Sequence, residues 1–219
     1  MPGSIKIDDG SGNYTILTNA GSLGSDKTIT IPNETATIAT TTATDLGGLV
    51  KLASTTASSS ATITFDDVFD ASTYSSYIIN LEQILAASDN VALRYNFRQG
   101  GASGSDITGG YDLWGNYFLN SNSTQNDMKQ SSTDYVTLAS TMGNVSTAEA
   151  LSTSLAFTAN SGGWKMLSAN FEIRRSDNLH IQYDHISGKN TATVCTGIKF
   201  YFSSGNIASG TMTVYGMKK

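Results

Sequence analysis

Hydrophobic and polar residues alternate with a period of two along much of this chain. The clearest case lies near the C-terminus, where Ile198, Phe200 and Phe202 alternate with Lys199 and Tyr201. This period is expected when one face of a β-strand is buried and the other face is in contact with solvent. We therefore predict a strand here, with its isoleucine and phenylalanine side chains in a core.

A second strand is predicted directly after this one. The link SSGNIASG interrupts the alternation, and Met212 and Val214 then resume it within TMTVY. Glycine and Asn206 readily adopt the positive φ angles that a tight hairpin link needs. We therefore expect segment 191–219 to form a β-hairpin inside a larger antiparallel sheet, with the apolar residues of both strands in its core.

Similar strand-like runs recur from residue 62 onward, separated by turns rich in glycine, serine and asparagine. They are YIINLEQI, VALRYNFRQ, GYDLWGNYFLN, DYVTLAST, LSTSLAFTA, WKMLSANFEIRR and NLHIQYDHI. LEQILAAS also fits a helical turn, and the Ser-x-x-Glu pattern from Ser146 to Glu149 is typical of a capping box that starts one. Many short strands with turns between them favour an antiparallel β-sandwich resembling a jelly roll, so we expect an all-β domain over 62–219.

Residues 1–45 carry shorter β segments with few large side chains. SIKI, YTILT, KTITI and TATIAT are separated by polar links, and their large apolar residues are mostly isoleucine. Isolated sheets of two or three strands are marginally stable in water, so this shaft or anchor needs a partner to cover its apolar face. Identical copies are the simplest partner, and we expect a homotrimer. The Ser/Thr/Ala-rich residues 46–61 are predicted to form a linker, within which LGGLVKL also fits a short strand or one helical turn.

The charge of the chain excludes two classes of partner. Charged residues make up 14% of the 219 residues, and the net charge is −5. No basic stripe is present to neutralise phosphates, which excludes nucleic acid and anionic membrane surfaces. No apolar run approaches the roughly 20 residues of a membrane span, so we expect no membrane insertion. MPGSIKIDDG contains no apolar signal-peptide core, and we expect no export by that route.

The residues with catalytic or metal-binding chemistry do not form a recognisable motif. Cys195 is the only cysteine, which excludes an intrachain disulfide, and its strand-like context favours a small core residue. His180 and His185 lie an odd number of residues apart, so a regular strand would place them on opposite faces and they would not share a metal. Surface or pairing roles are the preferred interpretation of both histidines.

The carboxylates Asp66, Asp67 and Asp70 form a sequence cluster with two interpretations. Converging carboxylate oxygens can serve a glycosidase or bind Ca²⁺, whereas a polar loop that enters a strand needs no ligand. We prefer the polar loop. The chain also has no Gly-x-Ser-x-Gly elbow, phosphate-binding loop or His-Glu-x-x-His motif, so we expect no enzyme, catalytic residue, metal or cofactor.

One segment, GGYDLWGNYFLN, has the character of a binding site. Its candidate receptor-binding residues are Tyr111, Asp112, Trp114, Asn116 and Tyr117. Large amphipathic rings beside hydrogen-bonding groups suit a sugar or protein receptor. The alternative is core packing, because in a regular strand Trp114 faces away from Tyr111 and Tyr117. Trp164, after a Ser-Gly-Gly link, has the same two interpretations.

Several of these segments together resemble a known family. GSIKI, a glycine link, YTILT and KTITIPNETATIAT resemble the opening of short fibre proteins of tailed bacteriophages, particularly marine phages and cyanophages. FDDVFDASTYSSYIINLEQI, VALRYNFRQGGAS and FYFSSGNIASGTMTVYGMKK resemble the distal domains of those fibres. The resemblance covers residues 3–42 and 65–217. It implies a homotrimeric virion fibre with a β-rich shaft and a β-sandwich tip.

The resemblance also implies a function. The chain would be a non-enzymatic virion structural protein, assembled in the host cytoplasm and exposed on the particle surface. Its tip would bind a host-surface polysaccharide or protein, and residues 1–45 would contact other virion proteins. The sequence begins directly in the shaft-like segment, which leaves attachment to tail, baseplate or capsid open. A capsid-decorating head fibre is therefore one alternative. A tailspike-type depolymerase is another, although no long parallel β-helix repeat is present.

Overall fold

The computed structural model describes residues 4–8, 14–18, 48–120, 125–145, 147–159, 163–175 and 177–219. The chain divides into two compact units, Met1–Ala43 and Thr44–Lys219. The described residues form β-strands and two 3-10 turns, η1 (Gly101–Ser103) and η2 (Thr147–Glu149), but no α-helix. The predicted all-β class is therefore confirmed. No helix in this described part is long and apolar enough to cross a membrane.

The N-terminal unit contains a small antiparallel sheet. Its two strands are β1 (Ser4–Asp8) and β2 (Tyr14–Thr18). The register pairs Ile5 with Leu17 and Ile7 with Thr15. The predicted segments SIKI and YTILT are confirmed as strands, whereas the segments expected over 19–45 lie outside the described residues.

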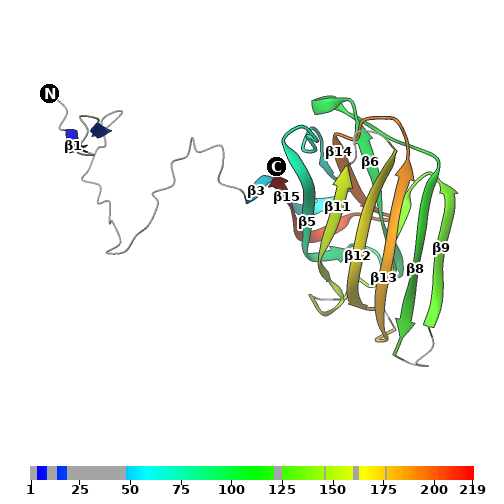
Figure 1. The fold of residues 1–219 in the computed structure, drawn as a ribbon. Coiled ribbons are helices and arrows are strands. Elements are labelled where there is room, and N and C mark those ends of the chain that lie inside the picture. The colour runs from blue at the N-terminus through cyan, green and yellow to red at the C-terminus, as the bar shows by residue number, and fades with distance from the viewer. Residues whose placement is uncertain are drawn as a thin grey trace. The chain divides into compact units, whose positions relative to one another are not determined.

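The C-terminal unit consists of two antiparallel sheets that pack as a β-sandwich (Figure 1). The five-stranded small sheet has the order β10 (Val136–Met142), β6 (Val91–Gln99), β14 (Gly197–Phe202) and β4 (Ile63–Phe65), with β7 (Ser105–Asp106) paired to the end of β6. The eight-stranded large sheet has the order β3 (Leu49–Ser60), β15 (Ile207–Lys218), β5 (Tyr74–Ala86), β11 (Leu151–Ala159), β12 (Trp164–Arg174), β13 (His180–Asn190), β8 (Tyr111–Leu119) and β9 (Gln125–Thr133).

The core lies between the two sheets and follows the alternation in the sequence. Tyr77, Ile79 and Leu81 of β5 are buried, and the residues between them are partly exposed. LEQILAAS therefore continues a strand and does not form a helical turn. Phe97 of the small sheet and Phe157 of the large sheet place their ring centroids 4.9 Å apart. Burial of such rings from both sheets is the main source of stability for this unit.

The predicted C-terminal hairpin is wrong, although both of its strands exist. β14 pairs with β4 and β6 in the small sheet, whereas β15 lies between β3 and β5 in the large sheet. The link between them crosses from one sheet to the other. Phe200 and Val214 are both buried, because the apolar faces of the two strands meet the same core from opposite sides. In the link Gly205 has a positive φ of 73°, whereas Asn206 does not.

The predicted linker over 46–61 is also wrong for most of its length. Residues 49–60 form β3, an edge strand of the large sheet. Its serine and threonine hydroxyls bond to β15, with Ser54 to Thr213 and Thr56 to Thr211 each at 2.9 Å. Small hydroxyl residues suit this edge because Ala57 is the only residue of β3 that is buried against the core.

Two loops differ in how well the sequence predicted them. The turn expected after Ser146 is confirmed by η2, where the Glu149 carboxylate accepts a hydrogen bond from the Val145 amide at 2.7 Å. The glycine-rich segment 100–110, one of the turns expected between strands, instead contains η1 and the short strand β7. Arg98 anchors β7, because its guanidinium donates to Asp106 at 2.6 Å.

Candidate functional site

Strand β8 divides the five predicted receptor-binding residues between the two faces of the large sheet. Tyr111 is fully buried, and its hydroxyl donates to the Ile107 carbonyl and accepts from the Phe97 amide, both at 2.8 Å. Burial raises the pKa of this hydroxyl above its usual range. Tyr111 is therefore a core residue that joins the two sheets, and its predicted contact with a receptor is wrong.

Tyr117 also points toward the core, where its ring centroid lies 6.3 Å from that of Tyr183. The outer face of β8 instead presents Asp112, Trp114 and Asn116. The parity argument is thus confirmed, and only these three of the predicted residues remain available on the surface.

The outer face of the large sheet carries an exposed apolar cluster around Trp114. We call it the tryptophan cluster, and its members with their exposed fractions are Trp114 (50%), Trp164 (38%), Met166 (43%) and Ile186 (53%). The ring centroids of Trp114 and Trp164 are 6.2 Å apart, although β13 separates their strands. Between them Gly188 of β13 carries no side chain, so nothing from that strand separates the two rings.

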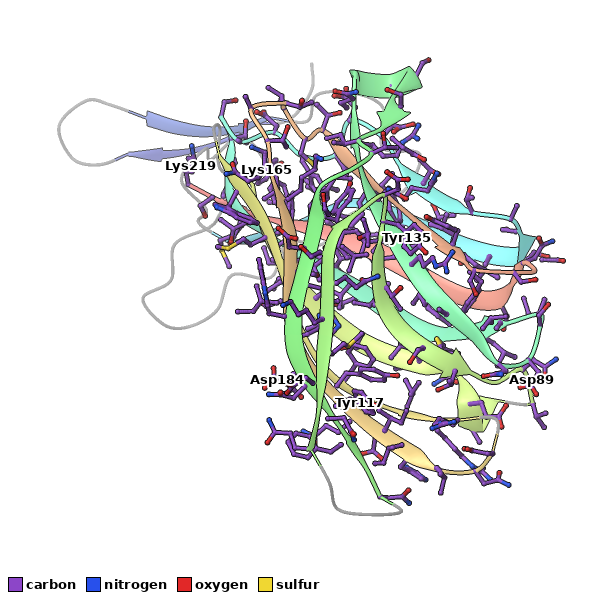
Figure 2. The ribbon with its side chains drawn as sticks, turned by 90° about the vertical axis from the view of Figure 1, so that its right-hand side faces the viewer. Asp89, Tyr117, Tyr135, Lys165, Asp184 and Lys219 are labelled. Carbon is purple, nitrogen blue, oxygen red and sulfur yellow. The ribbon has the colours of Figure 1, made fainter. Side chains whose placement is uncertain are left out.

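A shallow groove lies beside the tryptophan cluster on the same outer face. Its volume is about 410 Å³, and it lies over β11, β12 and β13. The outward-facing lining residues are Ser154, Ala156, Ser168, Asn170, Asp184 and Ile186. Small side chains from β11 and β12 form its floor. Asp184 lies on this outer side of the sheet in Figure 2, opposite in direction to Tyr117.

Asp184 occupies the centre of a row of hydrogen-bonding groups. Its cross-strand neighbours are Asn116 on β8 and Asn170 on β12. The three side chains make no hydrogen bond to another described residue, so their acceptors and amide donors are free for a ligand. The groove therefore combines uncommitted polar groups with an apolar wall, the composition that ligand sites require.

A smaller hollow of about 200 Å³ lies toward the other end of these strands, with Phe118, Glu172, His180 and Gln182 in its lining. His180 Nδ1 contacts Glu172 Oε1 at 2.5 Å. His185 faces the core, where its Nε2 contacts the Leu138 carbonyl at 3.0 Å and burial lowers its pKa. The prediction that the two histidines lie on opposite faces is confirmed.

The aspartate cluster at the start of the sandwich does not converge on one point. Asp66 pairs with Arg98 at 2.6 Å, whereas Asp70 accepts hydrogen bonds from the hydroxyls of Ser72 and Thr73. These hydrogen bonds lower the pKa of Asp70 to about 2, and the bond from Ser72 has the largest effect. Asp66 and Asp70 thus have separate structural partners, in agreement with the polar-loop interpretation.

The described ranges contain no cluster of metal ligands and no reactive thiol. No group of three or more His, Cys, Asp or Glu residues there is placed to hold a metal ion. Cys195 is buried, as predicted, and burial raises the pKa of its thiol to about 12. A thiol with that pKa stays protonated and unreactive at neutral pH.

The exposed apolar cluster and the uncommitted polar groups of this unit lie together on the outer face of the large sheet. The sequence identified Trp114, Asn116 and Trp164 as candidates, and it missed Ile186 and Asp184, which lie on other strands and join them only through register. Comparisons with protein-family models, curated proteins and solved structures found no match for this chain.

Proposed function

We propose that this chain is a non-enzymatic bacteriophage fibre protein whose β-sandwich binds a glycan receptor on the host surface. The observation that carries the binding role is the tryptophan cluster beside the groove on the outer face of the large sheet. Exposed contiguous apolar groups with a polar rim mark interaction sites on soluble proteins. This face is therefore the receptor-binding surface.

The chemistry of the face suits a sugar better than a wholly apolar partner. A pyranose ring has a flat apolar face of C–H groups, which packs on an indole such as Trp114, and a rim of hydroxyls. Asp184 and the neighbouring amides of Asn116 and Asn170 accept and donate the hydrogen bonds that those hydroxyls need. The apolar contact supplies affinity, and these three hydrogen-bonding side chains supply orientation.

The virion role is supported by the resemblance of the N-terminal and C-terminal segments to short phage fibres. A trimer is supported by the N-terminal unit, because its two-stranded sheet would be only marginally stable in water without a partner. Residues 1–45 would then hold three chains together and contact other virion proteins. The same arrangement serves a fibre attached to the tail or to the head.

A binding screen tests this function. The full chain is incubated with polysaccharides purified from bacterial surfaces, cyanobacterial ones among them, and bound protein and released reducing ends are both measured. We expect saturable binding without new reducing ends. Trp114→Ala should weaken binding at least tenfold, as the loss of a central aromatic anchor does.

The matched control is Tyr135→Ala, which removes a half-buried aromatic ring from the outer side of the small sheet. It should bind like the unchanged protein. Binding to none of the polysaccharides, or equal binding by Trp114→Ala, would refute the proposed face. Release of reducing ends would identify a depolymerase instead.

A further inference from the structure

Two parallel rows of side chains cross the strands on the outer face of the large sheet. The first, which we call the apolar row, consists of directly opposed cross-strand neighbours: Trp114, Ile186, Ser168, Ala156, Ile78 and Tyr215. Lysines flank it, since Lys129 of β9 faces Trp114 and Lys51 of β3 faces Tyr215. The row thus continues from one edge of the sheet to the other.

The second row, which we call the polar row, lies beside the first. On each strand its member is two residues away from the member of the apolar row. Its members are Asp127, Asn116, Asp184, Asn170, Ser154 and Asn80. The Ser154 hydroxyl donates to the Asn80 side-chain oxygen at 2.7 Å, which links the row across β11 and β5. At β15 the row ends, because Thr213 is buried.

The rows together form a long track with a hollow centre. Neighbouring strands lie about 4.8 Å apart, so a row across the eight-stranded sheet extends over roughly 34 Å. The groove of about 410 Å³ occupies the middle, where Ser168, Ala156 and Ser154 are small. Trp114 and Tyr215 provide large rings on either side of it. This length exceeds what one sugar can cover, so the track suits an extended chain.

The charges on the track select among extended chains. Two carboxylates, Asp127 and Asp184, lie in the polar row, whereas the lysines Lys129 and Lys51 lie only at the two ends of the apolar row. A polymer with regularly spaced phosphates or carboxylates would meet like charge at the groove and lose affinity. A chain of hydroxyl groups would meet acceptors and amides along its whole length.

Resting on the proposed function, we propose that the ligand is an extended, uncharged polysaccharide that lies across the strands along both rows. A single terminal sugar would use only the tryptophan cluster. An extended chain gains contacts at the groove and at Tyr215 as it lengthens. Affinity must therefore depend on chain length and on residues far from Trp114.

The test uses the full chain and the polysaccharide that it binds in the screen, cut by partial hydrolysis into a size series from disaccharide to octasaccharide. We expect affinity to rise at least tenfold between the disaccharide and the hexasaccharide. Tyr215→Ala should weaken hexasaccharide binding at least fivefold and leave disaccharide binding unchanged, which also shows that this variant is folded. Ala156→Arg, at an exposed position in the groove, should weaken binding of the long fragments most.

A second arm tests charge with the same polysaccharide after carboxymethylation, which should bind at least tenfold more weakly. Equal affinity for disaccharide and hexasaccharide, or tighter binding of the carboxymethylated chain, would overturn the inference. Selection of a naturally anionic polysaccharide in the screen would overturn it as well. In these cases the proposed function stands, provided that Trp114→Ala still weakens binding at least tenfold. Absence of any binding would instead refute the function itself.

Discussion

Phe200 and Lys199 are neighbours in β14 whose side chains lie on opposite faces of the small sheet. Phe200 is fully buried, whereas Lys199 pairs with Asp106 on the outer face. Phe200→Ala should lower the free energy of unfolding by about 3–5 kcal/mol through lost burial and the cavity that remains. Lys199→Ala should lower it by about 1 kcal/mol or less, because partly exposed ion pairs contribute little. Urea denaturation of both variants measures the difference.

Equal losses from the two substitutions would contradict this assignment of faces. A register shift of one residue exchanges every inward and outward side chain of a strand. The comparison therefore also tests the placement of Ile198 and Phe202.

His185 should make the sandwich less stable as the pH falls below about 6.5. Burial lowers the pKa of its ring in the folded chain, so below the unfolded pKa the unfolded chain binds a proton that the folded chain does not. The stabilisation is complete above that pH and declines between the unfolded pKa and the lower folded one. The measurement is the free energy of unfolding from pH 8 to pH 5.

Two variants separate this effect from other titrations. His185→Gln should flatten the decline over this range, whatever its effect at pH 8. His180→Gln should keep the decline, because it leaves the buried ring of His185 and its contact with the Leu138 carbonyl in place. An unchanged slope in His185→Gln would assign the pH dependence to other groups.

Removal of the N-terminal unit should leave the sandwich folded. A chain that begins at Thr44 retains β3 and should unfold cooperatively, with a denaturation midpoint close to that of the full chain. A chain that begins at Ala61 loses the ten residue pairs between β3 and β15 and should unfold at a clearly lower denaturant concentration. Coincident midpoints for the two shortened chains would mean that β3 adds little to the sheet.

The oligomeric state should depend on the same N-terminal unit. Analytical ultracentrifugation of the full chain at micromolar concentration should give three times the mass of one chain, because a two-stranded sheet such as β1-β2 needs a partner for stability and identical copies supply one. The chain from Thr44 should sediment as one copy. A monomeric full chain would remove the basis for the proposed trimer.

The sequence predicted which way side chains face better than which strands are neighbours. Alternation correctly placed Phe200 and Val214 in a core, because burial of one strand face is a local property. It predicted a hairpin wrongly, because two strands that face the same core from opposite sheets show the same local pattern as two paired strands. Residues 49–60 were misassigned for a related reason, since an edge strand buries too few side chains to show a clear apolar period.

The candidate site was predictable only within β8. Trp114 and Asn116 lie close together in sequence, and their direction follows from parity. Ile186 and Asp184 join them through the register of β13, which no local pattern specifies. A binding surface that crosses strands becomes visible only when the order of those strands is known.

The position of β15 also has a consequence for how this protein folds during its synthesis. β3 is the first strand of the sandwich to leave the ribosome, and among the described strands it pairs only with β15, the last one. β5 meanwhile keeps one edge unpaired until β15 arrives. Contacts between distant parts of a chain form slowly, and unpaired edges promote aggregation. The sandwich must therefore remain soluble with an open sheet while the strands from β4 to β14 are synthesised, and β15 completes the fold after all of them.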